Sequence, residues 1–129
     1  MTNALQIETF PYFFAIAKIR NPASINWKSP FVFVGKTDDE LSLVALESEV
    51  PSDAYPVDRG YRMMRVAGTL DMSLTGILAR ISKVLADEEI PIFAVSTYNT
   101  DYILVKSHTF KNAVQALSRA GYLVTNEIS

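Results

Sequence analysis

The alternation of apolar and polar residues divides the second half of the chain into strands and helices. Apolar residues recur every three or four positions between Leu74 and Leu85, and again from Phe110 to Ala120, which predicts two amphipathic helices. Short apolar runs bounded by turn residues predict the strands. The six elements are expected at 61–67, 74–85, 92–95, 102–105, 110–120 and 122–125. This βαββαβ order predicts an α+β, ferredoxin-like sandwich: a four-stranded antiparallel sheet with both helices on one face.

The first half shows strand patterns without a helix of normal length. Strands are expected at 5–8, 12–19, 31–34 and 41–46. The segment 41–46 alternates only at its start, so a short helix is the competing interpretation. The segment 47–60 contains two prolines and several acidic residues, which favours a linker or surface loop. We therefore expect two units, 1–60 and 61–129.

Composition narrows the classes of partner and compartment. The chain has 129 residues, 49% of them hydrophobic, and a net charge of −2 without a long basic run, so nucleic acid is not an expected partner. There is no cysteine and only one histidine, His108, so neither a disulfide nor a metal or other cofactor is expected. No apolar run reaches the roughly 20 residues that span a bilayer, so we expect no membrane association and a cytoplasmic location.

Two polar corners are present in the second half of the chain. One lies at 68–73, before the first helix, and the other lies at 96–101, in the turn of the hairpin that follows this helix. A helix N-terminus offers free N–H groups and a favourable dipole to a carboxylate, while Asp71 and Asp101 would attract an ammonium group. Simpler interpretations stay open for the same residues. Asp71 suits a helix cap, Gly76 suits close packing of helix and sheet, and Asp101 suits a turn.

The residues around these corners, 68–78 and 92–105, resemble the ACT-domain family, in the subgroup of small bacterial ACT-like proteins related to the eukaryotic cytosolic arginine sensor. The segment 37–44 resembles the leading motif of that subgroup. The resemblance implies two ACT-like units packed side by side, a degenerate one at 1–60 and an ACT domain at 61–129. It also implies a small ligand, most often an amino acid, at the interface between the units. The ligand-binding positions carried over are Asp71, Ser73, Leu74, Thr75, Gly76, Thr97, Tyr98, Asn99, Thr100 and Asp101, with Ser42 and Val44 from the first half.

The expected function is therefore that of a non-enzymatic, ligand-binding regulatory sensor, whose output passes through self-association or a partner protein. A different class is an interaction module that forms homo-oligomers through a sheet edge and binds no ligand. A third is an acid–base enzyme that uses Asp71 and Asp101. No nucleophile, base and orienting group are visible together in a chain with one histidine, so we do not expect an enzyme.

Overall fold

The computed structural model describes residues 5–67 and 75–126, and its chain divides into two compact units. Unit 1 comprises Met1–Pro11 and Arg62–Ser129, and unit 2 comprises Tyr12–Tyr61. Unit 2 ends at Tyr61, one residue after the boundary that we expected between 60 and 61. The N-terminal segment, however, belongs with the second half of the chain rather than with the first. Strand β5 (Val57–Ala67) contributes residues to both units.

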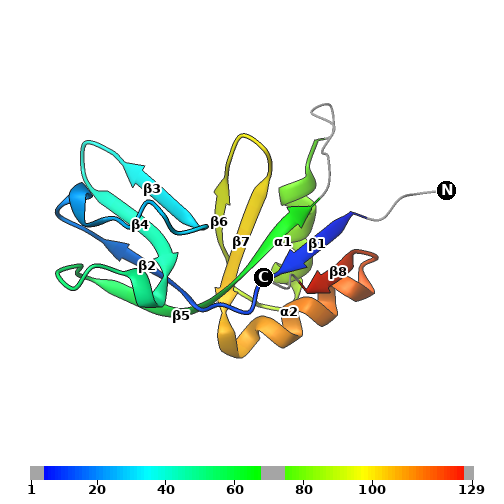
Figure 1. The fold of residues 1–129 in the computed structure, drawn as a ribbon. Coiled ribbons are helices and arrows are strands. Elements are labelled where there is room, and N and C mark those ends of the chain that lie inside the picture. The colour runs from blue at the N-terminus through cyan, green and yellow to red at the C-terminus, as the bar shows by residue number, and fades with distance from the viewer. Residues whose placement is uncertain (1–4, 68–74, 127–129) are drawn as a thin grey trace. The chain divides into compact units, whose positions relative to one another are not determined.

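Unit 1 has the expected βαββαβ order with one additional strand (Figure 1). The sheet order is β6-β7-β5-β1-β8, so β1 lies between β5 and β8. Strand β1 runs antiparallel to β5 and parallel to β8. Within the described residues, the sheet of unit 1 therefore has a fifth strand and contains a parallel pair, whereas four antiparallel strands were expected. The elements of unit 1 are β1 (Gln6–Thr9), the end of β5, α1 (Ile77–Asp87), β6 (Phe93–Ser96), β7 (Asp101–Lys106), α2 (Ser107–Arg119) and β8 (Leu123–Asn126).

Strand β1 fits between β5 and β8 because its buried side chains match those of both neighbouring strands. Ile7 pairs with Val66 on one side and with Val124 on the other, and all three pack into the core. Thr9 is 2% exposed, and its hydroxyl donates to the carbonyl of Thr125 (3.2 Å) and to Oδ1 of Asn126 (2.8 Å). The single buried polar side chain of this strand is thereby satisfied.

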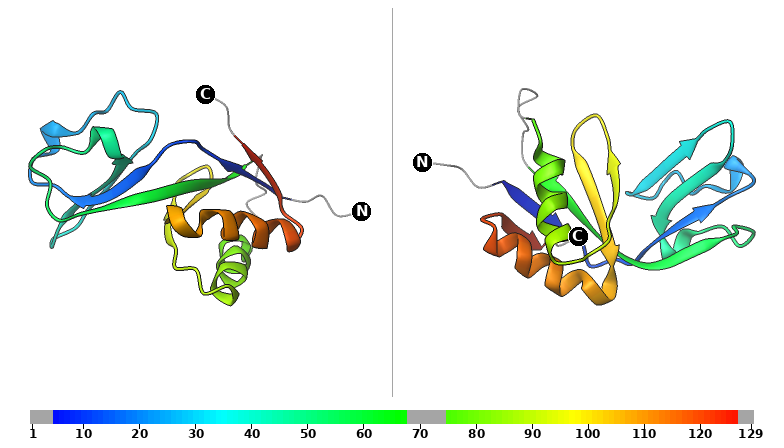
Figure 2. Two further views of the ribbon diagram at one scale, coloured as in Figure 1. Left: turned by 90° about the horizontal axis from the view of Figure 1, so that it is seen from below. Right: turned by 180° about the vertical axis from the view of Figure 1, so that it is seen from behind.

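Both helices cover the same face of the unit 1 sheet, as expected (Figure 2). The apolar stripe of α1 contributes Ile77, Ile81 and Leu85 to the core, and α2 contributes Ala113 and Leu117. These residues pack against alternate positions of the strands. The strand residues of the same buried cluster are Ile7, Met64, Val66, Ile103 and Val105.

The start of α1 differs from expectation. Asp71 was a candidate for the cap of this helix, but the N-cap is Gly76, which has a left-handed conformation (φ +74°) and makes no side-chain capping bond. The end of α2 is marked by Gly121, whose φ is +102°. Its N–H bonds to the carbonyl of Ser118, and the N–H of Tyr122 bonds to that of Leu117, a common way to end a helix.

Unit 2 repeats the strand order of unit 1 without the inserted strand. Its order is β3-β4-β2-β5, the same as β6-β7-β5-β8 in unit 1, with one-turn 3-10 helices at the positions of α1 and α2. The expected absence of a normal helix from this part of the chain is confirmed. The elements of unit 2 are β2 (Phe14–Lys18), η1 (Pro22–Ser24), β3 (Val32–Lys36), β4 (Leu41–Leu46), η2 (Glu47–Glu49) and the start of β5.

Two details of the sequence interpretation of unit 2 are settled by its strands. The segment 41–46 is a strand, β4, so the competing short helix was wrong. The expected loop at 47–60 was only partly right, because it begins with η2 and ends within β5. Strand β5 bulges next to β2 at Gly60, whose φ is +83° and whose N–H donates to Oε2 of Glu47 (2.6 Å). The bulge interrupts the alternation that would have marked a strand in the sequence.

Candidate functional site

The corner between β6 and β7 is a tight turn closed by its own residues. The N–H and hydroxyl groups of Thr97 both donate to the carbonyl of Thr100, over 2.9 and 3.0 Å. Tyr98 and Asn99 form the exposed tip, where the Tyr98 side chain is 95% exposed. These bonds fix the corner without help from the tip residues, so the tip side chains are available to other molecules.

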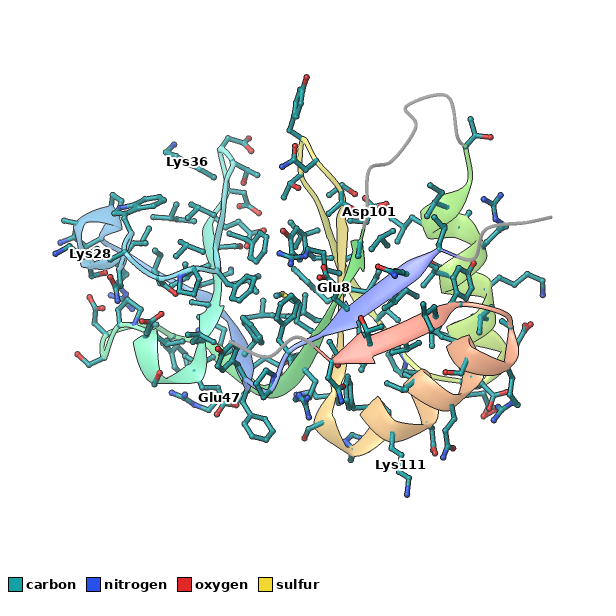
Figure 3. The ribbon with its side chains drawn as sticks, turned by 45° about the vertical axis from the view of Figure 1, so that its right-hand side comes forward. Glu8, Lys28, Lys36, Glu47, Asp101 and Lys111 are labelled. Carbon is teal, nitrogen blue, oxygen red and sulfur yellow. The ribbon has the colours of Figure 1, made fainter. Side chains whose placement is uncertain are left out.

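Two further bonds connect the base of this corner to the sheet. The hydroxyl of Thr100 donates to the carbonyl of Val66 near the end of β5 over 2.6 Å. The hydroxyl of Ser96 donates to Oδ1 of Asp101 over 2.5 Å. Oδ2 of Asp101 has no hydrogen-bond partner among the described residues. Asp101 lies on the hairpin and is only half-buried (Figure 3), so its carboxylate can attract a cation at the surface.

The N-terminus of α1 belongs to the same end of the unit 1 sheet. Ile77, the first residue of the helix, packs in one buried cluster with Val66 of β5 and Ile103 of β7. Because Gly76 has no side chain, it cannot cap the N–H groups of the first helical turn. Those groups carry the positive end of the helix dipole. An anion-attracting helix terminus and an anionic corner therefore share one end of the sheet.

The ligand-binding positions predicted just before α1, which we call the elbow, are only partly within the described residues. Asp71, Ser73 and Leu74 lie outside the described residues. Thr75 and Gly76 precede α1, so they lie outside the helix that we had expected to begin at residue 74. The carbonyl of Thr75 accepts a bond from Nη1 of Arg80 (3.1 Å), which ties the elbow to the helix.

The two predicted positions from the first half, Ser42 and Val44, lie on β4 of unit 2. The hydroxyl of Ser42 donates to Oε1 of Glu40 (2.6 Å). Val44 is 3% exposed and pairs with Ile16 and Phe33 on the neighbouring strands. Their participation in ligand binding stays a prediction.

A charged pair that sequence reasoning did not single out lies on the other face of the unit 1 sheet. Met64 and Val66 point into the core, so Arg65 points to the face without helices. Its Nε donates to Oε1 of Glu8 (2.8 Å), and its guanidinium lies 4.9 Å from the ring of Phe10 and 5.9 Å from that of Tyr102. The only signal in the sequence was an arginine within an apolar strand. Both charges are engaged with each other, so we assign this pair to the packing of β1 against β5.

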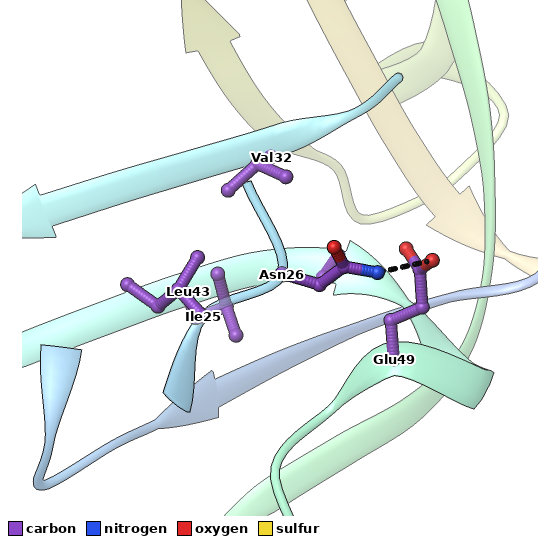
Figure 4. Close-up of a pocket in the computed structure, with 6 residues that line it drawn as sticks. Ile25, Asn26, Val32, Leu43 and Glu49 are labelled. Atoms are coloured by element: carbon purple, nitrogen blue, oxygen red, sulfur yellow. Dashed lines mark hydrogen bonds between the residues drawn. The ribbon is translucent and has the colours of Figure 1, made fainter. Parts of the chain in front are cut away.

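A narrow indentation, too tight to hold a water molecule, lies on one face of unit 2 (Figure 4). Its polar members are Asn26, whose Nδ2 donates to Oε2 of Glu49 (3.0 Å), and Glu49 itself. The other oxygen, Oε1, is buried and has no partner among the described residues. The remaining lining residues are apolar: Ile25, Val32, Leu43 and Ala45. The apolar walls offer this oxygen no donor. We therefore expect the indentation to affect the stability of unit 2 and do not assign it a ligand.

Over residues 5–67 and 75–126, no helix is long and apolar enough to cross a membrane. Within the same ranges, no three histidine, cysteine, aspartate or glutamate side chains gather in a way that would hold a metal ion.

Comparison with known proteins gives one sequence match and several structural ones. Residues 57–119 match the sequence model of the ACT domain. The structure resembles protein Atu0741 from Agobacterium tumefaciens, with 29% identity and a TM-score of 0.88, over 99% of this chain and 97% of that one. It also resembles VC0802 from Vibrio cholerae, a protein of unknown function described as a possible transport protein (16% identity, TM-score 0.71, 90% and 89% of the two chains).

A third match is the regulatory subunit of aspartate kinase from Thermus thermophilus in its ligand-free form. It has 10% identity and a TM-score of 0.64, over 89% of this chain and 96% of that one, a likeness that concerns the fold. No curated protein matches the chain in sequence.

Proposed function

Since residues 57–119 of this chain match the sequence model of the ACT domain, we propose that the protein is a cytoplasmic regulatory protein that binds an amino acid and catalyses no reaction. The observation that carries this proposal is the pairing of a helix N-terminus, whose N-cap residue Gly76 makes no side-chain capping bond, with an anionic corner at one end of the unit 1 sheet. An amino acid carries one group suited to each. The likeness in fold to a regulatory subunit of aspartate kinase supports a regulatory role.

In the proposed complex the two ends of the ligand are recognised by different elements. The carboxylate accepts bonds from the free N–H groups of the first turn of α1, where the dipole contributes about 0.3–1 kcal/mol at an exposed site. The ammonium group approaches Asp101, whose position is held by Ser96. The side chain of the ligand lies near the corner tip, at Tyr98 and Asn99. Ligands that lack either charged group are therefore expected to bind more weakly.

Binding would regulate by favouring one state of the protein over another. A ligand shifts such an equilibrium only by its difference in affinity for the two states. The change that Asp101 and α1 sense would pass to a partner protein or to a second copy of the chain. The expected readout of regulation is therefore a change in association that follows ligand occupancy.

The test is a thermal-shift screen of the protein against the twenty amino acids. At a ligand concentration of about 100 Kd the stabilisation is about 2.7 kcal/mol, and each kcal/mol raises the Tm of a domain of this size by roughly 3–6 °C. We expect one amino acid, or a chemically related group of them, to raise the Tm.

The matched pair of variants is Asp101→Asn and Asp53→Asn. Both remove one negative charge, and Asp53 is an exposed residue of unit 2 that is not part of the proposed site. Asp101→Asn should reduce the ligand-induced shift, and Asp53→Asn should leave it unchanged. If no amino acid at millimolar concentration shifts the Tm, or if both variants respond alike, the proposal is wrong.

One observation favours a second candidate, an interaction module that binds no ligand. Strand β6 lies at the edge of the unit 1 sheet and, within the described ranges, pairs only with β7. An open edge offers unpaired backbone groups to a strand of another chain. Light scattering would detect this as an oligomer whose size is the same with and without amino acids, whereas the first proposal expects the size or a partner's binding to depend on the ligand.

A further inference from the structure

An open groove lies beside α1, separate from the corner and the helix N-terminus described above. Its volume is about 310 Å³, at the lower end of the range for small-molecule sites. It runs between one face of α1 and the turn that joins α2 to β8, both within unit 1. The lining residues are Arg80, Lys83, Val84, Asp87, Ala120 and Tyr122.

The floor of the groove is apolar and firmly held. Val84 and Tyr122 are half-buried and pack against the core cluster of unit 1. Ala120 is small and lies just before the turn at Gly121, which leaves the space next to the Tyr122 ring open. An aromatic ring beside an aliphatic side chain is a suitable surface for a flat or aliphatic group.

The rim of the groove is charged, and its charges come from one face of α1. Arg80, Lys83 and Asp87 follow helical spacing, so their side chains project on the same side as Val84. The rim carries two positive charges and one negative charge, which favours an anion. Lys83 bonds to Asp87 over 3.1 Å, but both side chains are well exposed, and such pairs contribute only about 0.3–0.5 kcal/mol. Lys83 can therefore turn to a ligand at little cost.

Arg80 can serve a ligand without losing its own contact. One of its N–H groups donates to the carbonyl of Thr75, and a guanidinium has five N–H donors in all. We propose that this groove binds a small organic anion, with its carboxylate between Arg80 and Lys83 and its apolar body against Tyr122 and Val84. This site is independent of the amino-acid site, because it involves neither Asp101 nor the first-turn amides of α1.

The experiment is a titration of the protein with benzoate, followed by the backbone amide signals in NMR. We expect saturable shifts centred on Val84 and Tyr122. Two probes separate the parts of the ligand: acetate supplies the charge without the ring, and benzamide supplies the ring without the charge. Both should bind more weakly than benzoate. Shifts that do not saturate, or that are spread over the surface, would overturn the proposal, as would inorganic phosphate binding as well as benzoate.

Three charge variants predict changes of different sign. Lys83→Gln should weaken benzoate binding about twofold to fivefold, in line with an exposed ion pair. Asp87→Asn should tighten it, because it removes the repelling carboxylate. Lys111→Gln makes the same change on an exposed residue of α2 whose side chain points outward from that helix (Figure 3) and which does not line the groove, so it should leave binding unchanged. Equal effects of Lys83→Gln and Lys111→Gln, or weaker binding by Asp87→Asn, would refute the assignment.

Discussion

The hydroxyl of Thr100 donates a hydrogen bond to the main-chain carbonyl of Val66, over 2.6 Å and across 34 positions of the sequence. This bond joins the β6–β7 corner to the last part of β5. It fixes where Asp101, the next residue, leaves the corner. The amino-acid site that we propose therefore depends on a bond made by a residue that need not contact the ligand.

Replacing Thr100 with valine tests this bond. Valine keeps the shape of threonine but leaves the partly buried carbonyl of Val66 without its donor, which should lower the free energy of unfolding by about 1–2 kcal/mol. Thr100→Ser keeps the hydroxyl and should cost less. Urea denaturation measures both variants. A smaller cost for valine than for serine would mean that the methyl group of Thr100 matters and the bond does not.

Gly76 allows α1 to begin immediately after the elbow. Its φ of +74° is costly for residues with a side chain, and a Cβ atom at this position would lie 3.3 Å from Nη1 of Arg80. Gly76→Ala should therefore lower the free energy of unfolding by about 1–2 kcal/mol. Gly76→Asn should cost less, because asparagine adopts left-handed conformations more readily. Thermal denaturation compares the two, and a tolerated alanine would show that the start of the helix can adjust.

The sequence predicted the elements that are defined by local periodicity. The stripes of α1 and α2 and the strand pairs of the hairpins depend on neighbours in the chain, and they were found close to their expected positions. The place of β1 depends instead on matching Ile7 to Val66 and to Val124, residues far away in the chain. No periodicity within four residues reveals such partners, so a strand was expected there but its pairing was not.

The candidate site was predictable to a similar degree. The corner at 97–101 follows from turn residues between two apolar strands, and the structure confirms that turn. The cap of α1 was misassigned because an aspartate or serine is the usual choice, whereas the chain uses a glycine in the left-handed conformation. The partner of Arg65 could not be named, because Glu8 reaches it only through the insertion of β1.

The phenol of Tyr61 should ionise at a higher pH than an ordinary tyrosine side chain. Burial, followed by the hydrogen bond to Asp58 (2.6 Å) and the charge of that carboxylate, raises the pKa of Tyr61 to about 12 from 10.0. The folded state therefore holds this proton more tightly than the unfolded state. The resulting stabilisation is complete below pH 10.0 and is lost as the pH rises through about 12.

The ultraviolet absorbance of phenolate, measured against pH, checks the raised pKa of Tyr61. A late phase near pH 12 should be absent from Tyr61→Phe and should move to lower pH in Asp58→Asn, which removes the neighbouring charge. A late phase that persists in Tyr61→Phe would assign the raised pKa to another tyrosine.

Glu47 and Glu49 lie in the same 3-10 turn, η2, but should respond in opposite directions to replacement by leucine. Oε1 of Glu49 is buried without a partner among the described residues, and the walls around it are aliphatic. A leucine, which has a similar size, would remove the unpaired oxygen and place apolar atoms against those walls. Asn26, which loses its bond to Glu49, is exposed and can bond to water instead. Glu49→Leu should therefore raise the free energy of unfolding by about 1 kcal/mol.

Glu47→Leu is the matched variant, with the same change two positions earlier. Oε2 of Glu47 accepts the N–H of Gly60 over 2.6 Å and so holds the bulge of β5. Loss of a bond to a charged acceptor should lower the free energy of unfolding by about 1.5–3 kcal/mol. Urea denaturation of both variants gives the sign directly. If Glu49→Leu destabilises the protein as much as Glu47→Leu, the Glu49 carboxylate has a stabilising partner and the indentation requires it.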